Sequence, residues 1–214
     1  MQNPAVRRAF ALATDREKYA AADGSPMTAT TSVLARAIPG RPVADPIGIS
    51  NAADPGAARA VLTGAGVATP VVLRLSYAPS EPATRALSAL LPGWQQAGFA
   101  VTLVPRVAGP EAADVQLTQA WAVYPGGGAV LPALVAPLHD PARDAAVATA
   151  EQTPDATARN AAWGDLDATL TAAGDVVPLV ERQRVLLRGT DVQAYRVNAL
   201  LAGLPDLASI TVIR

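Results

Sequence analysis

The only histidine of this chain is followed directly by an aspartate. His139 and Asp140 come after a Pro-Leu pair and before Pro141. A carboxylate beside an imidazole can orient it for proton transfer, but that chemistry also needs a nucleophile. No serine motif accompanies the pair, and the chain contains no cysteine. We therefore predict that His139 is a loop residue and that Asp140 caps a helix starting at Pro141.

Carboxylates gather in the last third of the chain, at Asp165, Asp167, Asp175 and Glu181. Two residues separated by one position point to different faces of a helix, and the other two lie beyond the predicted helix. This spacing matches neither a glycosidase-type carboxylate pair nor a metal-ligand pattern. We predict a solvated surface here, and local helix pairing on a surface of the domain for the charged run 15–17. No catalytic residue, metal or cofactor is predicted.

Composition excludes several classes of partner. Half of the 214 residues are apolar, 16% are charged, and the net charge is −1. Lys18 is the only lysine, so no basic stripe exists for a phosphate backbone, and nucleic acid is not expected. The longest apolar run, Ala129 to Leu138, is broken by two prolines and falls short of the roughly 20 residues that span a bilayer. We predict a soluble domain with a sizeable core.

Capping residues, glycines and hydrophobic spacing divide the chain into alternating helices and strands. Helices are predicted at 4–21, 31–37, 55–64, 80–98, 141–150 and 154–173. Strands are predicted at 71–77, 100–107, 114–121, 176–187 and 209–213, with Pro178 placing the fourth at an edge or a bulge. The strand, helix and strand over residues 71–107 predict a parallel, right-handed βαβ unit. The fold class is therefore α/β, a mixed sheet with flanking helices.

Six segments follow one another in an order that resembles a known family. The opening helix, capped by Asn3, reads V-R-R-A-F-A-L-A-T-D-R-E from Val6, and D-P-G-A-A-R-A-V-L-T-G-A-G follows at 54–66. Then come L-P-G-W-Q-Q-A-G-F-A-V-T-L, A-D-V-Q-L-T-Q-A-W, the helix with Arg159 and Trp163, and D-V-V-P-L-V-E-R-Q-R-V. Their order and spacing are similar to those of bacterial extracellular solute-binding proteins of family 5, the peptide- and nickel-type capture components of ATP-driven importers.

That resemblance implies two α/β lobes of the type II periplasmic-binding-protein-like fold, with solute held between them. Residues 1–182 would form the C-terminal lobe, and residues 183–214 would return toward an N-terminal lobe. The opening helix corresponds to a segment well inside the family's proteins. We therefore expect this chain to be a domain fragment, with Met1 reflecting a cloning decision.

Peptide-binding members of this family carry a W-x-x-D-Y-type pattern in which the acidic residue receives the peptide's ammonium group. The corresponding stretch here runs from residue 120 to residue 128, and if Tyr124 is the anchor, the acidic position falls on Val123. No carboxylate occurs from Val115 to His139. A cation that leaves water for a closed cleft needs an opposite charge or several acceptors. We therefore do not expect this stretch to capture free peptide amino termini.

The candidate ligand-binding residues that remain in this stretch are Trp121, Tyr124, Gly126 and Gly127. Their rings and exposed backbone amides suit an apolar, aromatic-stacking or sugar-like ligand. The alternative is structural: Trp121 closes a strand into the core, Tyr124 covers an edge of the lobe, and the glycines form a turn.

Three functional classes stay open, of which an enzyme ranks last, because no nucleophile, base and orienting group can be named. The first is non-enzymatic capture of a small molecule, peptide or glycolipid at the cell surface, by a lipid-anchored parent protein that delivers its ligand to a membrane permease. The second follows a looser likeness to actinobacterial lipoproteins of the same fold. Those proteins are implicated in assembling phosphatidylinositol mannosides and lipoarabinomannan, without transport.

Overall fold

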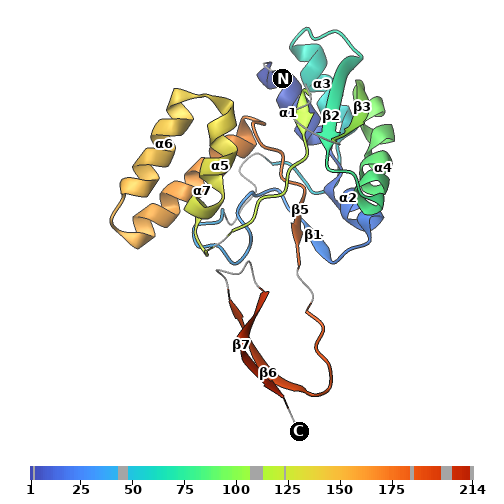
Figure 1. Cartoon of the computed structure of the whole chain (residues 1–214). Coiled ribbons are helices and arrows are strands. Elements are labelled where there is room, and N and C mark those ends of the chain that lie inside the picture. The colour runs from blue at the N-terminus through green and yellow to red at the C-terminus, as the bar shows by residue number, and fades with distance from the viewer. Residues whose placement is uncertain are drawn as a thin grey trace. The chain divides into compact units, whose positions relative to one another are not determined.

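The computed structural model shows two compact units (Figure 1). It describes residues 1, 3–42, 48–106, 113–122, 124–183, 186–198 and 204–212. The first unit contains Met1–Val33, Pro42–Gln119 and Asp167–Arg182, and the second contains Leu34–Arg41, Ala120–Leu166 and Gln183–Arg214. Within the described residues, no helix is long and apolar enough to cross a membrane.

A three-stranded parallel sheet forms the centre of the first unit. Its strands are β2 (Val71–Tyr77), β3 (Phe99–Pro105) and β4 (Val115–Gln116), in the order β3-β2-β4. The predicted parallel pairing of the first two strands is confirmed. The third strand is much shorter than the predicted 114–121, because Val115 pairs with Leu75 near the end of β2 and little of β2 remains beyond that register.

The two helices flanking these strands begin and end where their capping residues predict. The Asp54 side chain accepts a hydrogen bond from an N–H of α3 (Pro55–Gly64) at 2.8 Å, and Ser80 does the same for α4 (Glu81–Ala97) at 3.2 Å. Gly98 ends α4 with φ +97°, a conformation that favours glycine. Helix α4 packs against β3 and buries an apolar face comprising Ala83, Ala86, Leu87, Leu90, Trp94 and Ala97. The βαβ unit therefore supplies most of this unit's core.

The predicted single helix over residues 4–21 is in fact two helices, α1 (Pro4–Ala13) and α2 (Arg16–Asp23). Thr14 between them is extended, and its hydroxyl donates to the Phe10 carbonyl at 2.6 Å and accepts from the Trp94 indole N–H at 3.1 Å. Asp15 then caps α2. The break is set by a tertiary hydrogen bond from α4, which the apolar spacing of the opening segment does not reveal.

Arg16 is fully buried, so the prediction that residues 15–17 lie on the surface is wrong at this position. Its guanidinium donates to the carbonyls of Pro178 at 2.8 Å, Thr14 at 3.1 Å, and Ala11 at 3.3 Å. Backbone carbonyls from separate segments therefore replace water around the charge. Arg16 ties α1 and α2 to the chain leading into β5.

Two short antiparallel strands, β1 (Met27–Ala29) and β5 (Val180–Arg182), complete the first unit. The sequence does not predict β1, and β5 covers only part of the predicted 176–187, of which residues 184 and 185 lie outside the described residues. Beside them the Asp23 carboxylate forms an ion pair with Arg182 at 3.0 Å.

That ion pair changes the ionisation of its neighbours. Burial alone raises the pKa of the Asp23 carboxyl, but hydrogen bonds from Ser25 and the charge of Arg182 outweigh burial and leave the pKa below its ordinary value. Burial raises the pKa of the nearby Tyr19 hydroxyl, although Arg182 opposes the shift. Asp23 is therefore held ionised and Tyr19 neutral.

The second unit contains the helical segments that precede and follow Asp140. These are the one-turn segment η1 (Gly127–Ala129), α5 (Leu131–Val135), η2 (Ala136–Leu138), α6 (Pro141–Gln152) and the first part of α7 (Ala156–Ala172), whose end belongs to the first unit. Helices α6 and α7 confirm the predictions at 141–150 and 154–173. The predicted helix at 31–37 is absent, and this segment forms turns.

The turn segment lies directly on the backbone of α7. A methyl group at Gly164 would collide with the Gly40 carbonyl oxygen, and one at Gly40 would collide with the Asn160 carbonyl oxygen. Gly40 also has φ +88°. Leu34 and Ile38 in the same turn segment are buried. Tertiary packing rather than helix propensity therefore sets the conformation of this segment.

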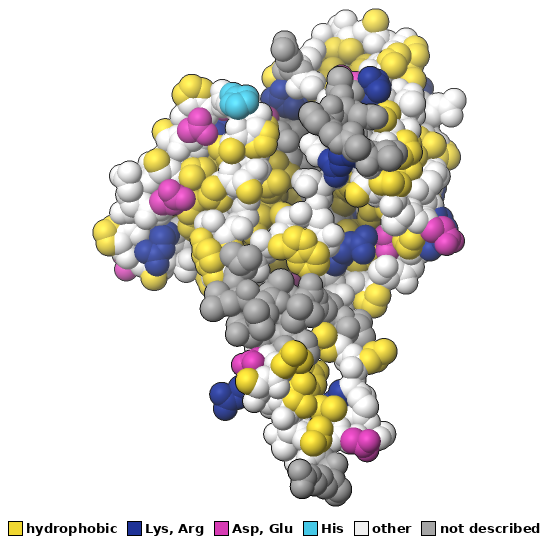
Figure 2. Space-filling view, in the orientation of Figure 1, with side chains coloured by type: hydrophobic (Ala, Val, Ile, Leu, Met, Phe, Trp, Pro, Cys, Tyr) yellow, Lys and Arg dark blue, Asp and Glu magenta, His cyan; other side chains and the backbone are white. Residues whose placement is uncertain are grey.

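The last described residues form an antiparallel hairpin, β6 (Val192–Asn198) with β7 (Leu204–Val212). The sequence predicts only its end, as the strand at 209–213. Apolar side chains gather on the hairpin surface (Figure 2), and Val197, Leu207 and Val212 are each more than half exposed.

Candidate functional site

A tight glycine corner follows Tyr124 in the second unit. The N–H of Gly126 donates to the Tyr124 carbonyl at 2.9 Å, and Ala129 donates to the Gly126 carbonyl at 3.0 Å, which starts η1. A methyl group added at Gly126 would lie 3.0 Å from the Tyr124 ring, and one added at Gly128 would lie 2.8 Å from the Tyr124 hydroxyl oxygen. The glycines therefore leave room for the Tyr124 side chain beside the backbone.

Gly127 has a packing role of its own. It is buried, and a methyl group there would lie 2.5 Å from Cβ and Cγ of Trp163 on α7. Trp163 is 3% exposed. Glycine is thus required where the corner meets this helix, which fixes the backbone between Tyr124 and α5.

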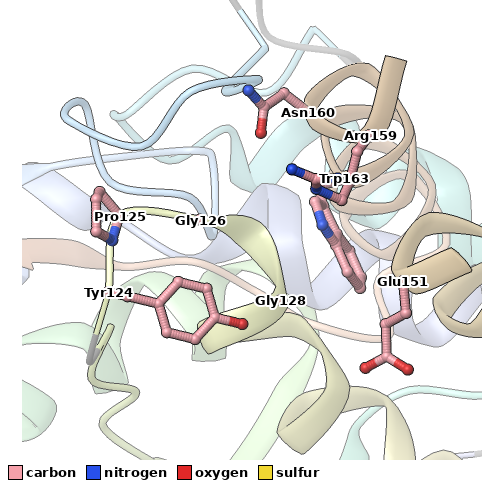
Figure 3. A pocket seen from close by; sticks show the side chains of 8 residues that line it. All are labelled: Tyr124, Pro125, Gly126, Gly128, Glu151, Arg159, Asn160 and Trp163. Carbon is pink, nitrogen blue, oxygen red and sulfur yellow. The ribbon is translucent and has the colours of Figure 1, made fainter. Parts of the chain in front are cut away.

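A pocket of about 300 Å³ lies between this corner and the helices that follow it (Figure 3). The corner contributes Tyr124, Pro125, Gly126 and Gly128. Helix α6 contributes Glu151, and α7 contributes Arg159, Asn160 and Trp163. In Figure 3 the Tyr124 ring stands on one side of the hollow, with Trp163, Arg159 and Glu151 on the other. The pocket combines aromatic walls with one cationic and one anionic group.

The loop between α6 and α7 determines where these charges stand. Asp155 caps α7 by accepting from the Ala158 N–H at 2.8 Å. One terminal nitrogen of the Arg159 guanidinium donates back to the carbonyls of Thr153 at 2.9 Å and Pro154 at 3.1 Å. These bonds hold the end of α6, and with it Glu151, beside the start of α7.

The sequence-predicted site residues are only partly brought together. Tyr124 and Gly126 line the pocket, whereas Gly127 is buried against Trp163. Trp121 is not among the lining residues and is 51% exposed, so the alternative in which it closes a strand into the core is wrong. Val123 lies outside the described residues. Ligand binding by these four candidates remains a prediction.

The sequence reasoning missed Glu151 and Asn160 as lining residues. One signal for Glu151 was available, because it stands in the last turn of α6, where the helix dipole disfavours a carboxylate. Because Glu151 lies far from Tyr124 along the chain, the sequence does not show that the two residues line one pocket.

The remaining candidates have the structural roles that the sequence predicts, except for two of the four carboxylates. Asp140 caps α6 through the N–H groups of Ala142 and Arg143, and His139 is an exposed loop residue with φ +51°. Asp165 is exposed, as expected, whereas the Asp175 side chain is only 12% exposed and forms an ion pair with Arg7 at 3.3 Å, so the prediction of a solvated carboxylate is wrong there. Among the described residues, no group of three or more His, Cys, Asp or Glu side chains is placed to hold a metal ion.

Asp167 is the other exception, because it is 1% exposed rather than solvated. Its carboxylate accepts from the Ser32 hydroxyl at 2.6 Å and from the Val33 N–H at 3.0 Å, and the Thr171 hydroxyl lies 3.3 Å away. These donors compensate for the lost water. Asp167 therefore fixes the segment after β1 to the end of α7.

With this geometry, the chain has the fold of periplasmic-binding-protein-like solute-binding proteins, as the sequence predicts. It matches clavulanic acid biosynthesis oligopeptide binding protein 2 with a TM-score of 0.84 and 22% identity, over 99% of this chain and 44% of that one. The murein tripeptide binding protein MppA of Escherichia coli matches with a TM-score of 0.80 and 19% identity, over 99% of this chain and 45% of that one.

A third solved structure is the ABC transporter substrate binding protein CtaP of Listeria monocytogenes, with a TM-score of 0.69 and 18% identity. The match covers 85% of this chain and 41% of CtaP. This chain thus spans less than half the length of each of these three proteins. No protein-family model matches the chain, and no curated protein matches it. At these identities the likeness establishes the fold.

Proposed function

We propose that this chain is one lobe of an extracellular solute-binding protein that captures a small molecule or peptide for an ATP-driven importer and performs no chemistry itself. The observation that carries the proposal is the match over 99% of the chain to a protein named for oligopeptide binding. A pocket with two aromatic walls and two charges in the same chain supports it.

We further propose that residues 1–182 form most of the C-terminal lobe and that residues 183–214 return toward an N-terminal lobe. Exposed apolar side chains on the β6–β7 hairpin support this, because large apolar surfaces are usually covered by a partner. In this proposal the whole protein stands outside the cell, held at the membrane by a lipid, and releases its ligand to a permease. The lipoglycan-assembly alternative stays a prediction from the sequence, because none of the three named structures favours it.

The proposal is tested by screening the purified 214-residue chain against peptides of two to nine residues, sugars and glycolipid headgroups. A ligand present at 100 times its dissociation constant should raise the free energy of unfolding by about 2.7 kcal/mol. NMR chemical-shift changes in the millimolar range would reveal weaker ligands. Solute capture by this chain is rejected if no class of compound moves either the unfolding midpoint or any resonance.

Two matched variants locate the ligand once one is found. Tyr124→Ala removes an aromatic wall of the pocket, whereas Trp121→Ala removes a half-exposed ring that does not line it. We expect the first variant to weaken binding about tenfold and the second to change it less than twofold. The reverse result would place the ligand at Trp121 instead of in the pocket.

A further inference from the structure

The pocket contains a carboxylate and a guanidinium that do not neutralise each other. Glu151 and Arg159 both line it, yet they form no ion pair with each other in the described structure. Unpaired opposite charges in a single hollow favour a ligand that carries both signs, because each end then meets its complement.

Glu151 is placed where its own helix does not stabilise it. It stands in the last turn of α6, a turn without basic residues, where unsatisfied carbonyls give a partial negative charge. Glu151 is exposed and lines the pocket, and among the described residues it accepts no hydrogen bond and forms no ion pair. A ligand ammonium group is the partner that this arrangement favours.

Arg159 presents complementary donors. It is half-buried, and one terminal nitrogen is occupied by the carbonyls of Thr153 and Pro154. Within the described residues, Nε and the second terminal nitrogen make no hydrogen bond, although the side chain lines the pocket. The occupied nitrogen anchors the guanidinium, and the remaining donors suit a carboxylate.

The pocket that these two charges line is small and partly aromatic. Tyr124 is 46% exposed and Trp163 is 3% exposed, so one ring is free to lie against a ligand while the other forms a fixed wall. A volume of about 300 Å³ stands at the lower end of the range for small-molecule sites. A single amino acid or a dipeptide suits this volume, and a long peptide would have to leave most of its length outside.

We propose that this pocket binds a small dipolar ligand, an amino acid or dipeptide with an apolar or aromatic side chain. Glu151 receives the ammonium group, Arg159 receives the carboxylate, and the side chain lies against Tyr124. This inference rests on the proposed solute capture and names the ligand class for it. It also reverses the expectation from the acid-free stretch 115–139, because α6 brings a carboxylate to Tyr124 from outside that stretch.

The test measures dissociation constants for the 214-residue chain by NMR titration with L-phenylalanine, N-acetyl-L-phenylalanine and L-phenylalaninamide. Blocking either end removes one charge, and each blocked compound should bind at least about tenfold more weakly than the free amino acid. A dipeptide of phenylalanine serves as the longer probe, and an uncharged nonapeptide blocked at both ends serves as the comparison.

Variants then assign each charge. Glu151→Gln should weaken the binding of L-phenylalanine about tenfold. It should leave the affinity for N-acetyl-L-phenylalanine within twofold of that of the unaltered chain, because the acetylated compound has no ammonium group. Glu17→Gln removes an equal charge from an exposed position in the other unit and should change neither affinity. Arg159→Lys keeps the charge but not the planar fork, and it should weaken the free and acetylated compounds equally.

Two results overturn the inference in different ways. If the blocked nonapeptide binds as tightly as the free amino acid and Glu151→Gln has no effect, the dipolar ligand is wrong while solute capture stands. If none of the probes shifts any resonance, the dipolar ligand is again wrong, and the wider ligand screen decides separately whether solute capture survives.

Discussion

Replacing Gly127 by alanine tests whether the glycine corner is a packing feature or an exposed backbone site. Its new methyl group would lie 2.5 Å from two atoms of Trp163 near that residue's backbone, where a simple side-chain rotation gives no relief. Overpacking of this kind costs about 1–3 kcal/mol, and the more restricted unfolded chain returns about 0.4–1 kcal/mol. We therefore expect Gly127→Ala to lower the free energy of unfolding by roughly 1–2 kcal/mol.

Urea unfolding followed by tryptophan fluorescence measures this loss, and thermal unfolding should show a midpoint lower by about 2–8 °C for a chain of this size. The control is Gly64→Ala at the end of α3, where a methyl group meets nothing within 4 Å. It should stabilise the chain by about 0.5–1 kcal/mol. The reasoning is refuted if Gly127→Ala unfolds at or above the midpoint of the unaltered chain. Loss of ligand binding with unchanged stability would instead support an exposed backbone site.

Two further outcomes concern packing and charge. Gly164→Ala places a methyl group against the Gly40 carbonyl oxygen, so it should destabilise the chain by about 2–3 kcal/mol in urea unfolding; an unchanged midpoint would mean that the two backbones are not in contact. Asp23→Asn should destabilise the chain at neutral pH, because Arg182 and Ser25 hold the folded-state pKa of the carboxyl below its ordinary 3.8. Stability from a lowered acid pKa is present above that ordinary value and is lost as pH falls through the folded-state pKa. The gap between Asp23→Asn and the unaltered chain should therefore narrow below about pH 4, and a gap that is constant from pH 7 to pH 3 would contradict this.

Local signals in the sequence predict the regular elements that are stabilised from within. Asp54 and Ser80 satisfy the first N–H groups of α3 and α4 and so mark where these helices begin. The alternation of β2 and the spacing of α4 predict the parallel βαβ unit in the same way. Each of these signals acts over a few residues, so the neighbouring residues in the sequence are enough to predict the element.

The candidate site was less accessible to sequence reasoning, because its parts come from distant segments. Trp121 and Tyr124 were identified by type and position, but only Tyr124 lines the pocket. Asp167 looked solvated by spacing alone, yet the Ser32 hydroxyl and the Val33 N–H replace its water. A carboxylate's surroundings depend on which segment folds over it, and that information lies far away in the chain.

By itself, the sequence determined the α/β class, most helix boundaries and the absence of a carboxylate between residues 115 and 139. The tertiary structure decided that Thr14 breaks the opening helix, since the hydrogen bond that its hydroxyl accepts comes from Trp94, eighty residues away. It also decided that the glycine corner shares a pocket with Glu151 and Arg159. Capping and periodicity act between near neighbours, whereas a pocket's charge depends on which helices pack around it.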